Sequence, residues 1–335
     1  MAASIFLLLG VILWGPPARR KHRAPPEVPA LIAFYPPDAE IVILFPHRHR
    51  EVFARYLVRE LSRYLSSTHP RTRFHVFAAQ DTSSLPFSRG VSLNVALAYV
   101  AAKYSADQAV VIQDVDVVPR RNVSYECPPR GVVHIWWLNA GGMKGRLGDF
   151  VRAGGFSNLF SGWGGEETSF WHRLESHGIE HRIWYKLDRP RGAVVLDLQG
   201  HDQDYWHSGE NDGSDEEVFF AHQTHPEHGV GGQLLRNAPA PDWYDPHVFG
   251  RNEALKNYLD GLPPSELAAL CEVDGLAAVE LGSVRSDDFF SDVALRPNLR
   301  VTNLVFDRVE VLGRRTPASF QDHAAILRFL AQSQT

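Results

Sequence analysis

Short apolar runs alternate along the chain with stretches in which apolar residues recur at helical spacing. Short continuous apolar runs are typical of buried parallel strands, whereas a spacing of three or four residues indicates one face of a helix. The pattern predicts strand, helix, strand, helix and strand in turn, at Ile41–Phe45, Phe53–Leu65, Phe74–Gln80, Leu93–Tyr104 and Ala109–Pro119. Strands that alternate with helices predict a doubly wound, mostly parallel α/β sheet with right-handed crossovers.

Polar side chains gather where each of the three predicted strands ends. The clusters lie at His47–Arg50, Asp81–Arg89 and Asp114–Asp116. Ligands of doubly wound sheets bind beyond the carboxyl ends of the strands. The coincidence of three clusters therefore predicts a ligand site at this edge of the sheet.

The rest of the chain predicts one further helix and several small β segments. The helix lies in Thr168–Leu174 and ends near Gly178. Strand-like patterns follow it and return near the C-terminus, at Glu180–Leu187, Gly192–Leu198, Ala277–Leu281 and Leu299–Leu312. From His201 the chain is rich in His, Asp, Gly and Glu with weak periodicity, and we interpret residues 202–245 as a surface insertion.

The N-terminus predicts a targeting segment followed by a linker. The apolar stretch Ala2–Trp14 is shorter than the roughly 20 residues of a transmembrane helix, so residues 1–15 are interpreted as a signal peptide or a short signal anchor. Basic residues follow this stretch, which leaves the mode of anchoring open. A proline-rich stem, one folded domain and a C-terminal tail or helix are then expected, at residues 16–37, 38–313 and 314–335.

Composition narrows the function classes. The net charge of -5 over 335 residues gives no general electrostatic reason to expect a nucleic-acid partner. The two cysteines, Cys127 and Cys271, lack the CxxC spacing of a metal site, and the sequence leaves open whether they pair. The sequon Asn122-Val123-Ser124 would serve as a glycosylation site if the chain enters the secretory pathway.

The polar clusters carry the residue types that bind a metal and an anion. In an extended segment Asp114 and Asp116 share one face, and two hard oxygen donors suit Mg²⁺ or Mn²⁺ beside a diphosphate. Arg48 and Arg50 offer forked donors for phosphate, and Arg89 follows Phe87, a ring that could lie against a base. The alternatives are solvated or capping aspartates and a basic helix start. The glycine-rich nucleotide fingerprints are absent.

A third feature is the stretch SGWGGEETSF, Ser161–Phe170, in which two carboxylates follow a glycine-rich loop. Glu166 and Glu167 could simply favour the start of a helix, where backbone N–H groups and the macrodipole attract acids. Alternatively, Trp163 forms an apolar platform for a substrate and one carboxylate is a general base.

Taken together, these motifs resemble those of the β-1,4-galactosyltransferase family, the glycosyltransferase family 7. The motifs FPHRHR, FSRGVSLNVAL, IQDVDVVP and GWGGEE stand in the family's order, and the resemblance runs from about Ile41 to Phe306 outside the insertion. It implies a GT-A fold, in which residues 38–313 form the catalytic domain. It also implies a metal-dependent, inverting transfer of a sugar from a UDP-sugar to a sugar hydroxyl.

Carried over by position, the resemblance implies two sets of ligands. Contacts to UDP would come from Pro46, Arg48, Arg50, Phe87, Arg89, Asp114 and Val115. Mn²⁺ or Mg²⁺ would bind Asp116 and His201, which stands in the segment LDLQGHD. The family's additional ligand just before that histidine is missing, because Leu198 or Gln199 occupies its place.

The resemblance also assigns the sugar-binding side. It places Glu167 where the family has its aspartate general base, with Trp163, Gly164, Gly165 and Glu166 lining the sugar and acceptor site. Asn139 stands where a tyrosine limits the space beside the second carbon of the donor sugar. A smaller residue leaves room for an N-acetyl group, so UDP-N-acetylgalactosamine rivals UDP-galactose as the donor.

The leading hypothesis is therefore an inverting glycosyltransferase that moves galactose or N-acetylgalactosamine onto a glycan acceptor, with no nucleic-acid partner. A Golgi membrane or secretory-lumen location is expected, with possible membrane anchoring through the N-terminus. The alternative is a non-catalytic UDP-sugar- or glycan-binding protein on the same fold. A metal-dependent hydrolase is disfavoured, because the histidines of the insertion lack a compact ligand spacing.

Overall fold

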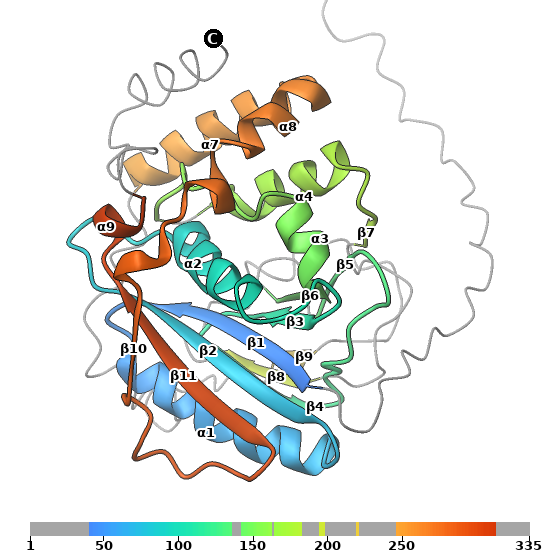
Figure 1. Cartoon of the computed structure of the whole chain (residues 1–335), viewed down its shortest axis with the longest axis vertical. Helices are drawn as coiled ribbons and strands as arrows, with labels where there is room; N and C mark the ends of the chain where they lie inside the picture. Colours follow the sequence, from blue (N-terminus) through green and yellow to red (C-terminus); the bar gives the residue numbers. More distant parts are fainter. Residues whose placement is uncertain are drawn as a thin grey trace, which may run out of the picture. The chain divides into compact units, whose positions relative to one another are not determined.

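The computed structural model describes residues 40–135, 142–162, 164–182, 194–197, 219–220 and 246–312. Its main sheet has eight strands in the order β10-β11-β2-β1-β3-β6-β5-β7. Their bounds are β1 Glu40–His47, β2 Arg73–Asp81, β3 Ala109–Ile112, β5 Val132–His134, β6 Met143–Arg146, β7 His181–Arg182, β10 Arg285–Asp287 and β11 Leu299–Phe306. Only β6 and β10 run against the common direction, so the sheet is mostly parallel (Figure 1).

The helices and a second, small sheet flank this main sheet. The helices in the described ranges are α1 Glu51–Thr68, α2 Arg89–Ala101, α3 Leu147–Arg152, α4 Glu166–Ser176, α7 Pro246–Asp260, α8 Pro264–Cys271 and α9 Arg308–Leu312. The small sheet is formed by β4 Val117–Arg121, β8 Val194–Asp197 and β9 Phe219–Phe220. None of these helices is long and apolar enough to cross a bilayer.

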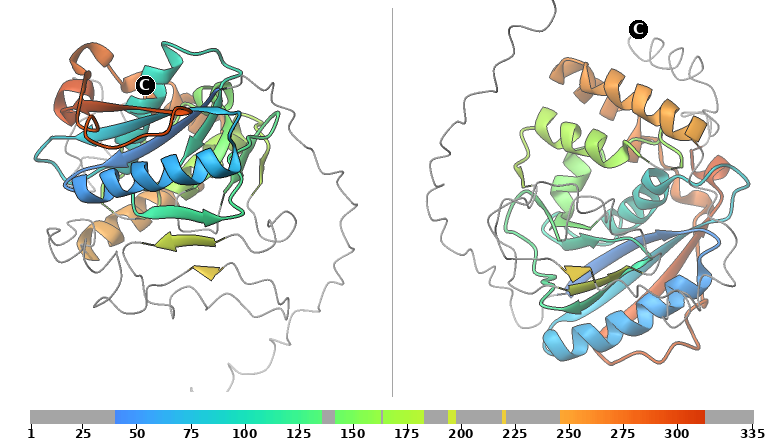
Figure 2. Two further views of the ribbon diagram at one scale, coloured as in Figure 1. Left: turned by 90° about the horizontal axis from the view of Figure 1, so that it is seen from below. Right: turned by 180° about the vertical axis from the view of Figure 1, so that it is seen from behind.

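The main sheet is covered on both faces, as its apolar strands require. In β1 the side chains of Ile41, Ile43 and Phe45 pack into the core on the α1 face, and those of Val42 and Leu44 pack on the opposite face. Successive side chains of a strand point to opposite sides, so a strand that is apolar throughout needs a helix layer on each. Figure 2 shows α1 and α2 on the two sides of the sheet. The predicted doubly wound, mostly parallel α/β fold is confirmed.

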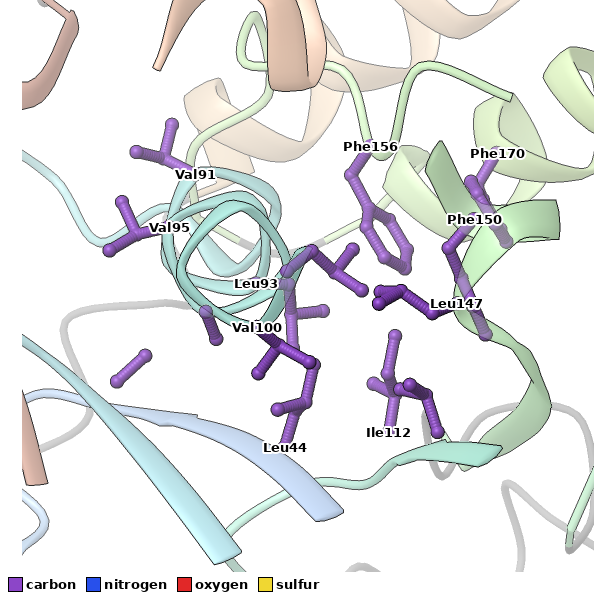
Figure 3. Packing of buried hydrophobic residues seen from close by; sticks show 14 of the residues in the cluster. Leu44, Val91, Leu93, Val95, Val100, Ile112, Leu147, Phe150, Phe156 and Phe170 are labelled. Atoms are coloured by element: carbon purple, nitrogen blue, oxygen red, sulfur yellow. The ribbon is translucent and has the colours of Figure 1, made fainter. Parts of the chain in front are cut away.

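The core on the α2 face also fixes where α4 lies. Leu44 and Ile112 from the sheet meet α2, and Leu147 joins them from α3 (Figure 3). The Phe170 ring of α4 stacks on the Phe156 ring at a centroid distance of 4.4 Å. Burial of each such side chain contributes about 1.5–3 kcal/mol. The Phe156–Phe170 stack therefore anchors α4 in the same core that α2 packs into.

The prediction of one strand over Ala109–Pro119 is wrong. β3 ends at Ile112, and β4 begins at Val117 and pairs with β8 in the small sheet. Between them the chain turns, with the Val117 N–H 3.4 Å from the Asp114 carbonyl oxygen. The apolar pattern continues through the turn because both strands are buried, and periodicity alone cannot locate the break. The two aspartates therefore lie on a turn and not on a strand.

The prediction of β strands at Ala277–Leu281 and Leu299–Leu312 is partly wrong. The stretch Ala277–Leu281 falls in two short 3₁₀ turns, Gly275–Ala278 and Leu281–Ser283, and β11 ends at Phe306, after which α9 begins. β11 pairs in parallel with β2 over eight residues, so it belongs to the main sheet and is no small appendage. Gly275 adopts φ +79°, and a Cβ there would lie 2.1 Å from the Gly154 carbonyl oxygen. This close approach favours a turn over a strand.

A buried polar network joins α2, α4 and the loop between α3 and α4. Arg173 of α4 forms an ion pair with Asp274, and both side chains are fully buried. The other Asp274 oxygen accepts from the Asn158 N–H at 2.9 Å. Asn94 of α2 donates to the Asn158 side chain at 2.8 Å and to the Phe156 carbonyl at 2.7 Å. Because buried polar groups need partners, this network sets the path of the loop.

Several expectations concern residues outside the described ranges. Residues 1–39 and 313–335 and most of 202–245 are not described, so the signal, stem, tail and insertion stay predictions. Within the insertion, Phe219–Phe220 pairs in parallel with β8. Cys127 and Cys271 are both buried, and they do not form a disulfide with each other.

The buried ion pair gives a stability prediction. Asp274→Asn should destabilise the protein by about 3–5 kcal/mol, because the Arg173 guanidinium loses its charge partner without regaining water. Urea unfolding measures this difference. Glu272→Gln, an exposed neighbour, is the control and should stay within about 0.5 kcal/mol of wild type. A similar small effect for Asp274→Asn would show that the ion pair is not essential.

Candidate active site

Arg89, at the start of α2, lies at the centre of a cluster built from distant parts of the chain. Its Nε donates to Asp114 Oδ1 at 2.7 Å. Its Nη2 lies 3.3 Å from Glu167 Oε1. Asp114 stands on the β3–β4 turn and Glu167 in the first turn of α4. The structure thus brings together three of the motifs found in the sequence, at the carboxyl ends of the parallel strands.

Acidic groups outnumber basic ones in this cluster. Burial raises the pKa of Glu167 to about 8, against the lowering effect of Arg89 and with the help of Asp114 and Glu166. Burial also raises the pKa of Asp114, opposed by Arg89 and reinforced by the nearby charge of Asp116. Carboxylates that raise one another's pKa favour the arrival of a proton or a cation. The site is therefore suited to proton transfer or to cation binding.

The two adjacent glutamates occupy different environments. Glu167 faces Arg89 and keeps a fifth of its side chain exposed. Glu166 is buried, its pKa is raised by burial, and Oε2 has no hydrogen-bond partner among the described residues. Neighbouring residues diverge by about 100° at a helix start, so only one of them can reach a bound hydroxyl. Their roles as base and acceptor-binding residue stay predictions.

The glycine-rich loop before α4 needs its glycines for conformational reasons. Gly164 and Gly165 adopt φ +101° and +87°, a region that side-chain-bearing residues avoid. A Cβ on Gly165 would lie 2.7 Å from the Phe160 ring. The Gly162 N–H donates to the Phe87 carbonyl at 2.6 Å, which ties this loop to the loop before α2. Trp163, the predicted sugar platform, lies outside the described residues.

Two residues that hold this loop were missed by sequence reasoning. Arg251 of α7 donates to the Ser161 carbonyl at 2.9 Å and to its hydroxyl at 2.7 Å, and Asn252 donates to the same carbonyl at 3.0 Å. Both lie about 90 residues further along the chain. The sequence around them has weak periodicity, and no local pattern marks them.

The predicted nucleotide contacts lie around the ends of β1 and β2. The guanidinium of Arg48 donates to the Leu85 carbonyl, lies 3.9 Å from Asp81 Oδ2, and sits 5.7 Å from the Phe87 ring centroid. Pro46 lies in β1 opposite Ala79, and Val115 is buried. The structure therefore places Arg48 beside Phe87, while the contacts of all these residues to UDP stay predictions.

The predicted metal ligands are partly described. Asp116 Oδ2 lies 3.2 Å from Arg50 Nη1. No group of three His, Cys, Asp or Glu side chains that could hold a metal occurs in the described ranges, and His201 lies outside them, as does Asn139. Asp114 and Asp116 nevertheless offer hard oxygen donors that are close enough to affect one another's charge. This donor set fits Mn²⁺ or Mg²⁺.

Comparisons with known proteins identify the relatives of this chain. Residues 34–128 match the family model for the N-terminal region of glycosyl transferase group 7, and residues 136–193 match the model for the N-terminal domain of galactosyltransferase. Mouse β-1,4-galactosyltransferase 4 is 28% identical over 167 residues, which cover 46% of each chain. Mouse β-1,4-galactosyltransferase 2 is 29% identical over 192 residues, 52% of this chain and 50% of its own length. The resemblance to the β-1,4-galactosyltransferase family is confirmed, and this chain spans about half the length of these relatives.

Solved structures give a weaker likeness. A Drosophila β-1,4-galactosyltransferase 7 in complex with manganese, UDP-galactose and xylobiose matches with a TM-score of 0.49 at 18% identity, over 80% of this chain and 94% of that one. A mannosyltransferase from Pyrobaculum calidifontis, in complex with GDP-mannose and Mn²⁺, matches with a TM-score of 0.36 at 12% identity, over 72% of this chain and 76% of that one.

The raised pKa of Glu167 predicts how stability depends on pH. A folded-state pKa of about 8, above the ordinary value of 4.5, means that the stability from the protonated carboxyl is present below pH 4.5 and is lost as the pH rises toward 8. Glu167→Gln should therefore raise the Tm at pH 8 by about 2 °C or more, with a smaller difference at pH 5. Thermal melts across this pH range measure the effect.

Glu126→Gln is the control for this series, because Glu126 is an exposed carboxylate away from the cluster. Its Tm should follow wild type at every pH. If the Tm of Glu167→Gln and that of wild type depend on pH in the same way, then burial does not raise the pKa of Glu167.

Proposed function

We propose that this protein is an inverting, metal-dependent glycosyltransferase. It transfers galactose or N-acetylgalactosamine from a UDP-sugar to a hydroxyl of a glycan acceptor. The observation that carries the proposal is the ion-paired chain Asp114–Arg89–Glu167, which joins the Asp-Val-Asp turn to the second carboxylate of the GWGGEE motif. Arg89 therefore links the turn proposed to lie at the sugar donor to the carboxylate proposed to deprotonate the acceptor.

The acceptor hydroxyl would lose its proton to a carboxylate oxygen of Glu167. At the same time, the oxygen of that hydroxyl would attack the anomeric carbon of the donor sugar. The new bond forms between the acceptor oxygen and that carbon, while the bond from the carbon to the diphosphate oxygen breaks and UDP leaves with the electron pair. A single displacement inverts the anomeric centre. Arg89 fixes the orientation of Glu167 by its contact at 3.3 Å, and orientation contributes strongly to such a step.

A divalent cation, Mn²⁺ or Mg²⁺, would be held by Asp116 and His201. When bound, it would neutralise negative charge on the diphosphate. Arg50, whose guanidinium lies 3.2 Å from Asp116 Oδ2, is placed to add positive charge on the same side. The three residues belong to distant parts of the sequence.

The proposal is tested by the release of UDP from UDP-galactose and UDP-N-acetylgalactosamine in the presence of Mn²⁺ and a panel of sugar acceptors. Acceptor-dependent release that is abolished by a chelator is the expected result. Tight binding of UDP without any release would instead favour the alternative, a non-catalytic UDP-sugar-binding protein. The absence of both binding and release would overturn the proposal.

The base assignment gives a kinetic prediction. Glu167→Gln keeps the size of the side chain but removes its basicity, so kcat should fall by roughly 10²–10⁴-fold while the Kd for the UDP-sugar hardly changes. Glu166→Gln is the matched control, and it should raise the acceptor KM more than it lowers kcat. A Glu167→Gln enzyme with nearly normal turnover would disprove the assignment.

The donor preference rests on Asn139. If Asn139 lines the pocket, wild type should use UDP-N-acetylgalactosamine at least as well as UDP-galactose, because the smaller side chain leaves room for the N-acetyl group. Asn139→Tyr should shift the ratio of kcat/KM values toward UDP-galactose. Asn139→Ala, which keeps the space open, serves as the control. Strict rejection of the N-acetylated donor by wild type would contradict the pocket interpretation.

For location, we propose the Golgi membrane or the lumen of the secretory pathway, with residues 1–15 as the targeting or anchoring segment. The apolar stretch and the proline-rich stem that follows it support this proposal. Imaging of the full chain with a C-terminal fluorescent tag, with and without residues 1–15, tests it.

A further inference from the structure

The loop between β2 and α2, residues 82–88, is held through two neighbouring backbone carbonyls. Arg48, just after β1, donates its guanidinium N–H to the Leu85 carbonyl. Arg308, the first residue of α9, donates from Nη1 to the Pro86 carbonyl at 2.8 Å. The two arginines are 260 positions apart in sequence, yet they bind consecutive residues of one loop. Phe87 follows directly, and Arg89 comes two residues after it.

The C-terminal strand supplies further contacts to the same loop. The Thr82 N–H and hydroxyl both donate to the Phe306 carbonyl, at 3.0 and 2.9 Å. Phe306 is the last residue of β11, and Arg308 follows two positions later. The beginning of the loop is therefore held by β11 and its later part by α9. A short segment of the C-terminal region thus contacts both the beginning of the loop, at Thr82, and its later part, at Pro86.

Arg308 occupies an electrostatically unfavourable position. Only 2% of its surface is exposed, and burial is the main cause that lowers its pKa to about 10. Arg48 and Arg251 lower the pKa further, while Asp81 raises it. Taking a guanidinium out of water costs stability unless its charge is well paired and hydrogen-bonded. Stability alone does not account for a guanidinium here, whereas the contact to Pro86 does.

The loop that Arg308 holds is also hydrogen-bonded to the glycine-rich loop before α4. The Phe87 carbonyl accepts from the Gly162 N–H at 2.6 Å, and the Ser88 hydroxyl donates to the Phe160 carbonyl at 2.7 Å. A displacement of Pro86 would therefore move the Phe87 ring and also release the glycine-rich loop before α4.

We propose that Arg308 is a positioning residue for nucleotide binding, which holds the Pro86 carbonyl so that the Phe87 loop is preformed for UDP. The choice of UDP as the ligand rests on the proposed function. The inference goes beyond that function because Arg308 lies outside the four motifs that resemble those of the family. Arg308 itself touches no substrate. Its contribution is to reduce the ordering that the loop must undergo on binding, and pre-organisation of this kind acts on affinity.

The test compares Arg308→Met, Arg308→Lys and the control Arg300→Met in the full chain. Arg300 lies on β11, the strand that precedes α9, and its exposed side chain pairs with Glu40 at 2.7 Å, away from the loop. Hydrogen exchange of the peptide covering residues 82–88 is measured without ligand. The Kd for UDP with Mn²⁺ and the kinetic constants are measured separately.

Arg308→Met should speed exchange in residues 82–88 and weaken UDP binding about tenfold, the loss expected for one buried hydrogen bond to a charged donor. The kcat at saturating donor should change by less than about threefold, because Glu167 is untouched. Arg308→Lys keeps the charge and one donor, so it should recover part of both losses. It is also the deciding variant if Arg308→Met does not fold. Arg300→Met should leave exchange and affinity unchanged.

Unchanged exchange in residues 82–88 in Arg308→Met, or in Arg308→Lys if Arg308→Met does not fold, would overturn the positioning role. Faster exchange with unchanged UDP affinity would overturn its link to nucleotide binding. A wild-type protein that binds no UDP would overturn the proposed function, and the exchange data would then still decide whether Arg308 holds the loop.

Discussion

The neutralisation of one buried guanidinium, that of Arg89, is the constraint on which the candidate site depends. A charge that is removed from water needs partners, and Arg89 finds them in Asp114 and Glu167. These acids come from the β3–β4 turn and the start of α4, so the turn and the helix must both approach the start of α2. The same contacts leave a surplus of carboxylates, which is the property that a cation or a proton transfer needs.

A network of polar side chains on α2 and at its N-cap holds the loop before α4 close to Arg89. Ser88 accepts from the Val91 N–H at the start of α2 and donates to the Phe160 carbonyl, so one hydroxyl caps a helix and fixes a loop. One and a half turns further along α2, Asn94 binds the same loop through Phe156 and Asn158. Because α2 and the loop share these bonds, the position of Arg89 and the position of the glycine-rich segment are set together.

The sequence departs from the family pattern at the proposed catalytic base. Glutamate stands at position 167, where the resemblance to the family implies an aspartate. The longer side chain of Glu167 allows the contact to Arg89, and burial keeps its pKa high. A base with a raised pKa is a stronger proton acceptor once ionised, which suits deprotonation of a sugar hydroxyl. The glutamate at this position is therefore compatible with the proposed sugar transfer.

The sequence by itself determined the elements whose signals are local. β1 and β2 follow from short continuous apolar runs, and α1 and α2 from apolar residues at helical spacing. The acids and arginines at strand ends were found because parallel strands present their carboxyl ends at one edge. The tertiary structure decided what depends on distant contacts. It broke the stretch Ala109–Pro119 after Ile112, because β4 pairs with β8 in another sheet. It also brought Arg251 and Arg308 to loops 90 and 222 residues away. Such partners are chosen by the packing of the whole sheet, and no local pattern of residues records them.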